Sequence, residues 1–227
     1  MKKFLITGIK SGLGQFLFES IKDSYGLTRD NFNDIKSESF DVIVHCAYNK
    51  ENTITNHKKY LNDNIILTQD LKKLKYKKFI YISSIDVYSE NLSMYATFKK
   101  FSETLMDSED IILRCSAMVG KSMKANSLTK LYENVDSISL SGESTMNYIL
   151  YSDLLNFVLN ADQYKGIIDF VANDFAKIEN IKGLFNSKTR LGNYTYNSVM
   201  NFTNPIYKLN ESYNKSSIQV LREYYGI

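Results

Sequence analysis

Short apolar runs alternate with longer amphipathic segments through the first half of the chain, and this alternation constrains the fold most. The runs are rich in β-branched and aromatic residues, as expected of strands buried on both faces of a parallel sheet. The expected strands are residues 3–7, 27–29, 40–47, 78–83 and 110–115. Apolar residues recur at helical spacing in residues 15–22, 55–73 and 93–106. Strands that alternate with helices predict an α/β fold with a Rossmann-type, doubly wound parallel sheet.

The pattern becomes less regular in the second half of the chain. Strands are expected at residues 148–151 and 167–171, with a helix at 152–159 between them that Ser152 and Asp153 cap. Residues 186–216 are polar and favour loops, and residues 216–225 favour a closing helix. We therefore expect a single domain over residues 1–227, in which residues from about 116 to 227 form a small C-terminal lobe.

Composition excludes several classes of protein. The net charge is only +3 and the lysines are scattered among acids, so no nucleic-acid groove is expected. No apolar run approaches the roughly 18 residues of a membrane span, and no signal peptide is expected. Cys46 and Cys115 stand in apolar surroundings, and His45 and His57 lack metal-ligand spacing. These features predict a cytoplasmic protein with no metal site.

Three glycines follow the first expected strand. Gly8, Gly12 and Gly14 stand between that strand and the first expected helix, in the spacing G-x-x-x-G-x-G. Glycines let a backbone approach a pyrophosphate closely, and the helix N-terminus offers free N–H groups and a positive dipole. This placement predicts a dinucleotide-binding loop, although an ordinary turn is the alternative.

Two charged residues follow the second expected strand. Arg29 presents a planar guanidinium that suits the 2′-phosphate of NADP. Asp30 is an acceptor for the ribose hydroxyls of NAD. We favour NADP over NAD, and two solvated loop charges remain the alternative.

Tyr95 and Lys99 lie four residues apart in the third expected helix, so their side chains share one face. A nearby ammonium favours the phenolate and lowers the pKa of a tyrosine. Such a tyrosine transfers a proton to or from a substrate oxygen, and the hydroxyls of Ser83 and Ser84 are candidates to hold that oxygen. A surface helix contact is the alternative, because the chain has 17 tyrosines.

These motifs occur in one order, and together they resemble the extended short-chain dehydrogenases/reductases, specifically the NAD-dependent epimerase/dehydratase family. The resemblance covers about residues 1 to 175, and residues 27–35 are similar to the matching segment of dTDP-4-dehydrorhamnose reductases. It is carried by Gly8, Gly12, Gly14, His45, Cys46, Ala47, Asn64, Ser83, Ser84, Val87, Tyr88, Tyr95, Lys99, Leu113 and Arg114.

The resemblance implies roles for individual residues. Ser84, Tyr95 and Lys99 match the catalytic residues, and Arg114 would face nicotinamide and substrate. The residues implied to bind NADP or NAD are Gly8, Ser11, Gly12, Leu13, Gly14, Arg29, Asp34, Ile35, Cys46, Ala47, Ser83, Tyr95, Lys99 and Cys115.

The sequence departs from the family in four ways. The glycine spacing is that of simpler short-chain reductases, Cys115 stands where proline is usual, and the C-terminal part is short. Ile85 stands where 4,6-dehydratases carry an acid, and Asp86 is one position too late, so dehydration is disfavoured.

We therefore expect an enzyme, an NAD(P)-dependent oxidoreductase that reduces a keto group of a sugar, with a nucleotide sugar as the small-molecule substrate. A nucleotide-sugar epimerase and a non-catalytic dinucleotide sensor are the alternatives. Lysines at positions 121, 124 and 130 are candidates for a substrate diphosphate, and Tyr148 and Tyr151 for either a sugar pocket or the core. The helices at 55–73 and 93–106 are candidates for a homodimer through a four-helix bundle.

Overall fold

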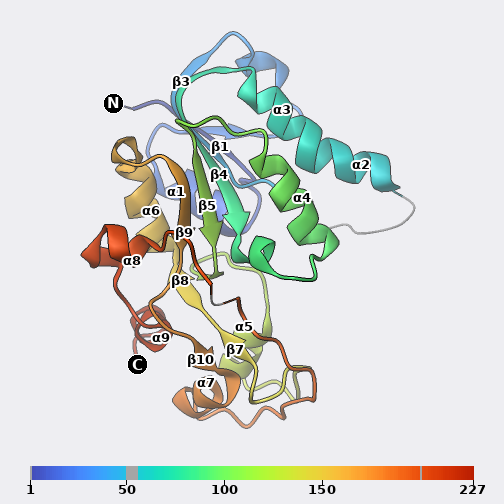
Figure 1. Cartoon of the computed structure of the whole chain (residues 1–227), viewed down its shortest axis with the longest axis vertical. Helices are drawn as coiled ribbons and strands as arrows, with labels where there is room; N and C mark the ends of the chain where they lie inside the picture. The colour runs from blue at the N-terminus through green and yellow to red at the C-terminus, as the bar shows by residue number, and fades with distance from the viewer. Residues whose placement is uncertain (1, 50–55, 200) are drawn as a thin grey trace.

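A six-stranded sheet forms the centre of the molecule (Figure 1), which we analysed as a computed structural model that describes residues 2–49, 56–199 and 201–227. All neighbouring strands are parallel, in the order β2-β1-β3-β4-β5-β9. The strands are β1 (Phe4–Thr7), β2 (Tyr25–Leu27), β3 (Ser39–His45), β4 (Lys75–Ser84), β5 (Ile111–Cys115) and β9 (Gly166–Phe170). The predicted α/β fold with a parallel sheet is confirmed.

Helices cover both faces of this sheet. On one face, α1 (Gly12–Ser20) and α6 (Tyr151–Leu159) pack together, and Leu17 and Phe157 share a core with Ile6 of β1. On the other face lie α3 (Leu67–Lys72) and α4 (Met94–Glu103), and Leu71 packs with Leu5 of β1. Successive residues of a strand point to opposite faces, so Leu5 and Ile6 enter different cores. A doubly wound sheet has such a core on each face.

The strand order contains a switch point between β1 and β3. The chain leaves β1 for β2 on one side, and it leaves β3 for β4 on the other. Connections that diverge in this way open a crevice at the carboxyl ends of the strands, where ligands of such sheets bind.

Three predicted boundaries differ from the structure. The second strand ends at Leu27, two residues before Arg29. The helix expected over residues 55–73 comprises α2 (His57–Leu61), a π-helical turn (Asn62–Ile66) and α3, and residue 55 lies outside the described residues. The predicted cap of α6 by Ser152 and Asp153 is wrong, because the helix begins at Tyr151 without a side-chain cap. Asp153 instead pairs with Lys215 at 3.1 Å.

Of the residues expected in the C-terminal lobe, β9 joins the main sheet and α6 packs against α1. The lobe itself consists of the elements of the second half outside β9 and α6, and it has its own apolar core and only short strands. Its strands are β6 (Ala117–Val119) paired with β8 (Tyr148–Leu150), and β7 (Thr145–Met146) paired with β10 (Ala176–Lys177). Its helices are α5 (Ser127–Tyr132), α7 (Ile178–Leu184) and α9 (Ser217–Tyr225). The loop-rich segment 186–216 contains only short helices, α8 (Ile206–Leu209) and a 3-10 turn (Glu211–Tyr213). Single-turn segments of the same kind lie at Asn33–Ile35, Ile85–Tyr88 and Ala161–Gln163.

Within the described residues, no helix is both long and apolar enough to span a bilayer. The same residues contain no group of three or more His, Cys, Asp or Glu side chains arranged to hold a metal ion.

Candidate active site

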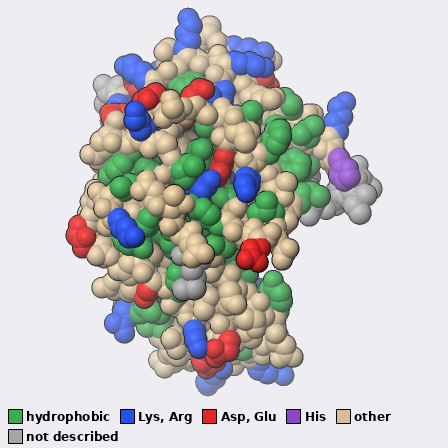
Figure 2. All heavy atoms as spheres, in the orientation of Figure 1, with side chains coloured by type: hydrophobic (Ala, Val, Ile, Leu, Met, Phe, Trp, Pro, Cys, Tyr) green, Lys and Arg blue, Asp and Glu red, His purple; other side chains and the backbone are tan. Residues whose placement is uncertain are grey.

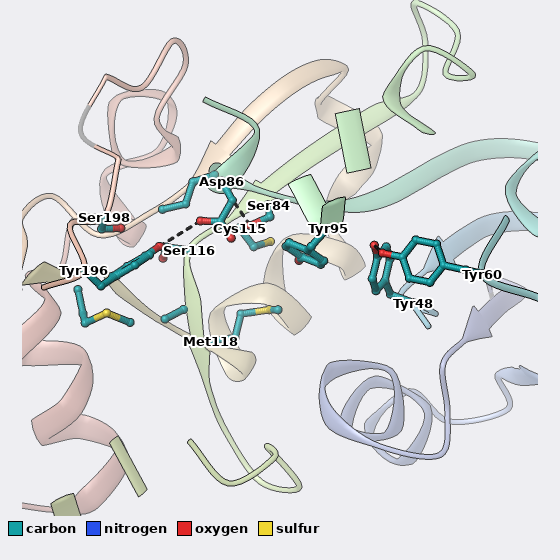
Figure 3. Close-up of a pocket in the computed structure, with 13 residues that line it drawn as sticks. Tyr48, Tyr60, Ser84, Asp86, Tyr95, Cys115, Ser116, Met118, Tyr196 and Ser198 are labelled. Atoms are coloured by element: carbon teal, nitrogen blue, oxygen red, sulfur yellow. Dashed lines mark hydrogen bonds between the residues drawn. The ribbon is translucent and has the colours of Figure 1, made fainter. Parts of the chain in front are cut away.

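A cleft of about 490 Å³ opens at the carboxyl ends of β4 and β5 (Figure 3). One wall comes from the sheet and its helices, and the other comes from the C-terminal lobe. The lining residues are Tyr48, Tyr60, Ser84, Ile85, Asp86, Tyr95, Cys115, Ser116, Ala117, Met118, Met146, Tyr196 and Ser198.

Ser84 and Tyr95 reach this cleft from consecutive elements. Ser84 is the last residue of β4, and its Oγ accepts the N–H of Asp86 at 3.2 Å. Tyr95 lies in the first turn of α4, where the Oγ of Ser93 caps the helix by accepting the N–H of Ala96 at 3.1 Å. The strand end and the helix start therefore bring together the two hydroxyls that the sequence proposed for catalysis.

Burial dominates the ionisation of Tyr95. It raises the pKa of the phenol well above its usual value, while a hydrogen bond with Ser84 opposes the shift and the charge of Asp86 adds to it. The expectation that Lys99 lowers this pKa below its ordinary value is wrong for this structure. Tyr95 is therefore held as a protonated phenol, which is the form that donates a proton.

Lys99 lies one helical turn beyond Tyr95 and is 3% exposed. Its Nζ donates to the carbonyl oxygen of Ile82 at 2.6 Å and lies 4.7 Å from the ring centroid of Tyr48 and 4.9 Å from that of Tyr81. The ammonium is therefore a buried cation that packs against Tyr48, one of the residues that line the cleft.

Two tyrosines that the sequence analysis did not select extend the same wall. The ring of Tyr48 meets that of Tyr95 edge-to-face at 4.9 Å, and its hydroxyl is hydrogen-bonded to that of Tyr60. Tyr48 directly follows Ala47 at the end of β3, and this position at the carboxyl edge of the sheet was the available signal.

The glycine loop lies at the switch point. Gly8 has a φ of +74°, and a Cβ on it would lie 2.9 Å from the backbone N of Ala47. A Cβ on Gly14 would lie 2.5 Å from the carbonyl oxygen of Gly8, so only glycine allows α1 to approach β1 this closely. Ser11, the N-cap residue of α1, makes no side-chain cap hydrogen bond, which leaves N–H groups at this helix end without a side-chain acceptor.

A buried chain of hydrogen bonds fixes the neighbouring end of β3. Thr68 donates to the carbonyl oxygen of Asn64 at 2.9 Å, so Nε2 of His45 donates to Thr68 and Nδ1 accepts from Thr7. Burial lowers the pKa of His45 to about 3, which keeps the ring neutral in these roles. The Oγ1 of Thr7 also accepts the N–H of Ala47 at 2.9 Å. Ala47 is thereby held against the glycine loop.

The two cysteines of the implied cofactor set are buried to different degrees. Cys115 lines the cleft beside Ser84, and burial raises the pKa of its thiol. Cys46 packs against the core next to Ala47, and burial raises the pKa of its thiol to about 12. Both thiols therefore remain protonated and behave as small apolar groups.

The residues implied to contact the adenine end lie apart from the cleft. Arg29 is 73% exposed and forms an ion pair with Asp63 at 2.5 Å. Asp34 is exposed, whereas the side chain of Ile35 is 5% exposed and packs in the core with Leu5. The charged head of Arg29 reaches solvent beyond the carboxyl end of β2.

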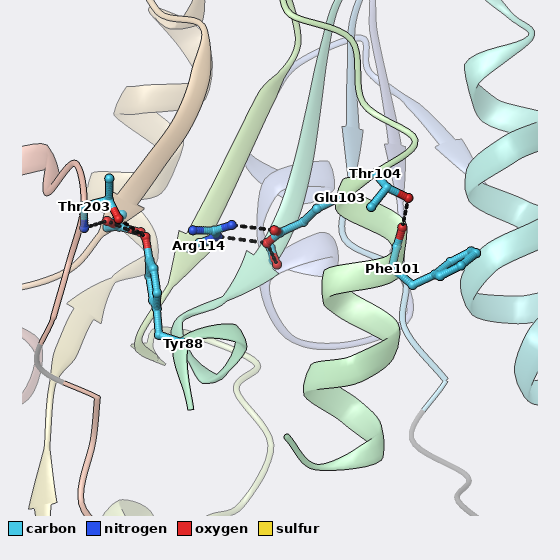
Figure 4. A network of polar contacts seen from close by, with 8 residues as sticks. Tyr88, Phe101, Glu103, Thr104, Arg114 and Thr203 are labelled. Carbon is cyan, nitrogen blue, oxygen red and sulfur yellow. Dashed lines mark hydrogen bonds and ion pairs between the residues drawn. The ribbon is translucent and has the colours of Figure 1, made fainter. Parts of the chain in front are cut away.

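Ser83 and Arg114 both bond to Glu103 outside the cleft lining, and Figure 4 shows the Arg114–Glu103 pair. The hydroxyl of Ser83 donates to Glu103 at 2.6 Å, and Arg114 donates to both carboxylate oxygens of Glu103 at 3.0 and 2.7 Å. The guanidinium lies 4.6 Å from the ring centroid of Tyr88, whose hydroxyl donates to Asp169 at 2.9 Å. These side chains brace α4 against the ends of β4, β5 and β9.

The candidates in the lobe are not brought into the cleft. Lysines 121, 124 and 130 are absent from its lining, and Lys121 is 79% exposed with Glu19 at 3.9 Å. Tyr148 and Tyr151 are buried, as the core alternative predicted. A Cβ on Gly12 would lie 3.4 Å from the hydroxyl of Tyr151, so this side chain reaches the glycine loop.

Solved structures with a similar architecture include dTDP-4-dehydrorhamnose reductases and UDP-sugar 4-epimerases. A dTDP-4-dehydrorhamnose reductase from Bacillus anthracis in complex with NADP is 16% identical, with a TM-score of 0.78 over 99% of this chain and 98% of its own. One from Clostridium acetobutylicum is 14% identical, with a TM-score of 0.76 over 99% and 98%. A UDP-glucose 4-epimerase from Thermotoga maritima is 13% identical, with a TM-score of 0.74 over 99% and 98%.

No protein-family model matches the sequence, and no curated protein matches it either. At these identities the likeness shows the fold, which agrees with the fold that the resemblance implied. The activity must be argued from the residues of the cleft.

Proposed function

We propose that the chain is an NAD(P)-dependent oxidoreductase of the short-chain type that reduces the keto group of a sugar carried by a nucleotide. The observation that carries the proposal is the shared cleft of Ser84 and Tyr95, with the Lys99 ammonium buried beside its wall. A phenol, a hydroxyl and a buried cation at the carboxyl edge of a doubly wound sheet suit the protonation of a developing alkoxide.

The glycine loop fits the cofactor. Positions 8 and 14 leave no space for a Cβ, and the end of α1 has N–H groups without a side-chain acceptor. The cofactor supplies a hydride. We assign its pyrophosphate to Gly8, Ser11, Gly12, Leu13 and Gly14. The remaining assignments are Asp34 and Ile35 near the adenine, Cys46 and Ala47 along the channel, and Ser83, Tyr95, Lys99 and Cys115 near the nicotinamide.

The residues of the cleft then have separate roles in the reaction. Ser84 orients the substrate carbonyl, and Tyr95 delivers its proton to the oxygen as that oxygen gains charge. Lys99 holds the nicotinamide ribose and stabilises the phenolate that remains. Ile85 offers no acid for eliminating water, which favours reduction over dehydration.

Arg29 carries the preference for NADP. Its guanidinium is exposed beyond β2, where it would meet a 2′-phosphate. Arg29→Ala should weaken binding of NADP about tenfold or more and leave binding of NAD within about twofold. Titration calorimetry with both cofactors measures this difference, and equal losses for the two would refute the assignment.

An epimerase is the second candidate, because similar structures include UDP-sugar 4-epimerases. Both reactions use the same residues and differ in the fate of the reduced cofactor. A reductase consumes NADPH with turnover, whereas an epimerase retains its cofactor. Purified protein supplied with NADPH and a dTDP-4-keto sugar distinguishes them by the loss of reduced-cofactor absorbance.

The protein also offers a surface for a second copy of itself. Apolar side chains gather over the helical segment from α2 to α3 and over α4 (Figure 2). The exposed ones include Leu61 at the end of α2, Ile66 in the π-helical turn and Phe101 in α4, at 43%, 38% and 55%. We propose a homodimer in which these helices form a four-helix bundle. Light scattering should give twice the chain mass, and Phe101→Asp should shift it to the monomer.

A further inference from the structure

A carboxylate stands beside the proposed catalytic serine. Asp86 follows Ser84 by two residues, in the turn Ile85–Tyr88, and lines the cleft. Its Oδ1 accepts a hydrogen bond from the hydroxyl of Tyr196 at 3.1 Å (Figure 3). The pair crosses the cleft, because Asp86 comes from the end of β4 and Tyr196 comes from the lobe.

Tyr196 is held firmly in this position. Its backbone N–H donates to the Oγ of Ser144 at 3.1 Å, and its carbonyl oxygen accepts from the N–H of Thr145 at 2.9 Å. Burial, followed by the charge of Asp86, raises the pKa of its phenol well above the usual value. The hydroxyl therefore keeps its proton and donates to Asp86.

Asp86 has capacity beyond that one bond. A carboxylate accepts about four hydrogen bonds and donates none, and Oδ1 uses one acceptor position for Tyr196. Among the described residues that line the cleft, none is Lys, Arg or His. The lining itself thus carries one carboxylate among hydroxyl and apolar side chains, and the nearby Lys99 ammonium is separated from the cleft by Tyr48.

Ser116 provides a second, independent observation. It is 6% exposed and lines the same cleft, and its hydroxyl oxygen is buried without a hydrogen-bond partner. Buried polar groups in folded proteins are nearly always paired, and an unpaired one needs an explanation. A ligand hydroxyl reaching Ser116 after rotation of its side chain would satisfy it.

We propose that Asp86, anchored by Tyr196, and Ser116 form a substrate subsite that accepts ring hydroxyls of a neutral sugar and rejects a sugar with a carboxylate there. The inference rests on the proposed function and narrows it to a substrate class. Hydroxyl donors gain hydrogen bonds to Asp86, whereas a uronate brings a like charge into a cleft lining without a cation.

A matched pair of probes tests this subsite. UDP-glucose and UDP-glucuronate carry the same nucleotide and differ only in CH₂OH or COO⁻ at one ring carbon. With NADP⁺ present, calorimetry should give a Kd for UDP-glucose about tenfold or more below that for UDP-glucuronate. Asp86→Asn should reduce this ratio to about threefold or less, because only the uronate loses a repulsion.

Two controls separate charge from position. Glu90→Gln removes an exposed carboxylate outside the cleft lining and should leave the ratio unchanged. Tyr196→Phe keeps the charge of Asp86 but removes its anchor. It should therefore preserve the discrimination while weakening UDP-glucose binding several-fold.

Ser116→Ala separates a binding role from a structural one. If the hydroxyl serves the ligand, the variant loses several-fold in affinity for UDP-glucose and melts no lower than the parent. A lower melting temperature with unchanged affinity would remove Ser116 from the subsite.

The outcomes distinguish this inference from the proposed function. Equal affinity for the two probes, no binding of either, or an unchanged ratio in Asp86→Asn overturns the subsite while cofactor binding stands. Failure to bind both NADP⁺ and NAD⁺, measured in the same titrations, overturns the proposed function itself.

Discussion

The parallel sheet and the C-terminal lobe are stabilised in different ways. Paired strands of three to ten residues repeat through the sheet, and their side chains enter two apolar cores. The strands of the lobe are two or three residues long, and single bridges such as Ser137–Arg190 and Leu140–Tyr194 join its loops. Paired strands that are mostly longer stabilise the sheet, whereas the lobe depends on its own apolar core together with short strands and single bridges.

The cleft draws one wall from each region, and the two walls differ in chemistry. Ser84 and Tyr95, the groups suited to proton transfer, come from the sheet and its helix, where regular hydrogen bonding fixes them. Tyr196 and Ser198 come from the lobe. We expect the sheet side to carry the proton transfer, whereas the lobe contributes to substrate binding through Tyr196, which anchors Asp86 from across the cleft.

Replacing the proposed proton donor should have the largest effect. Tyr95→Phe removes the phenol from the sheet-side wall and should reduce turnover of a keto sugar about 10²- to 10⁴-fold, with cofactor affinity unchanged. Steady-state kinetics and cofactor titration measure both. Tyr194→Phe, at a ring 62% exposed in the lobe, is the control and should be silent. Undiminished turnover in Tyr95→Phe would refute the mechanism.

The second largest effect is expected from removal of a buried carboxylate. Glu103→Ala leaves the Arg114 guanidinium, which is 12% exposed, without its carboxylate partner, and should cost about 3 kcal/mol of unfolding free energy. Glu109→Ala breaks an ion pair with Lys165 in which both side chains are over 60% exposed, and should cost less than about 1 kcal/mol. Urea denaturation compares the two, and similar losses would contradict the assignment of Glu103 as a brace.

A smaller loss of stability is expected from substitution of a glycine between the sheet and the lobe. A Cβ on Gly120 would lie 2.1 Å from Cδ2 of Tyr151, so Gly120→Ala should destabilise the protein by about 1–3 kcal/mol. Gly183→Ala places a Cβ where nothing lies within 4 Å and should be neutral or stabilising. Thermal melting ranks the pair. A neutral Gly120→Ala would mean that Tyr151 moves freely away from the glycine loop.

The smallest effect is expected in the pH dependence of the reaction. The Asp86 charge raises the pKa of Tyr95, so Asp86→Asn should lower that pKa. Oxidation of a sugar hydroxyl needs the phenolate and should therefore rise at lower pH in the variant. Reduction needs the phenol, so its decline with rising pH should begin at a lower pH in the variant than in the parent. Turnover profiles in both directions measure this, and an unmoved profile would separate Asp86 from Tyr95.

Local patterns were sufficient for the regular part of the molecule. Mostly apolar runs such as Phe40–Cys46 predicted buried strands, because strands covered on both faces need apolar residues at nearly every position. The helices expected from residues 93 and 216 are present, and Ser93 and Ser216 cap them. The π-helical turn at Asn62–Ile66 was not predicted, because the carbonyl oxygen of Asn64 also accepts from Ser102, which is distant in sequence.

The sequence by itself determined the alternation of strands and helices, the place of the glycine loop and the order in which Ser84, Tyr95 and Lys99 appear. Only the tertiary structure decided that Ser84 faces the cleft while Ser83 turns to Glu103, that burial raises the pKa of Tyr95, and that Tyr196 meets Asp86. The physical reason is the distance along the sequence over which the interactions act. Periodicity and capping act between near neighbours, whereas desolvation and contacts between residues 110 positions apart depend on how the whole chain packs.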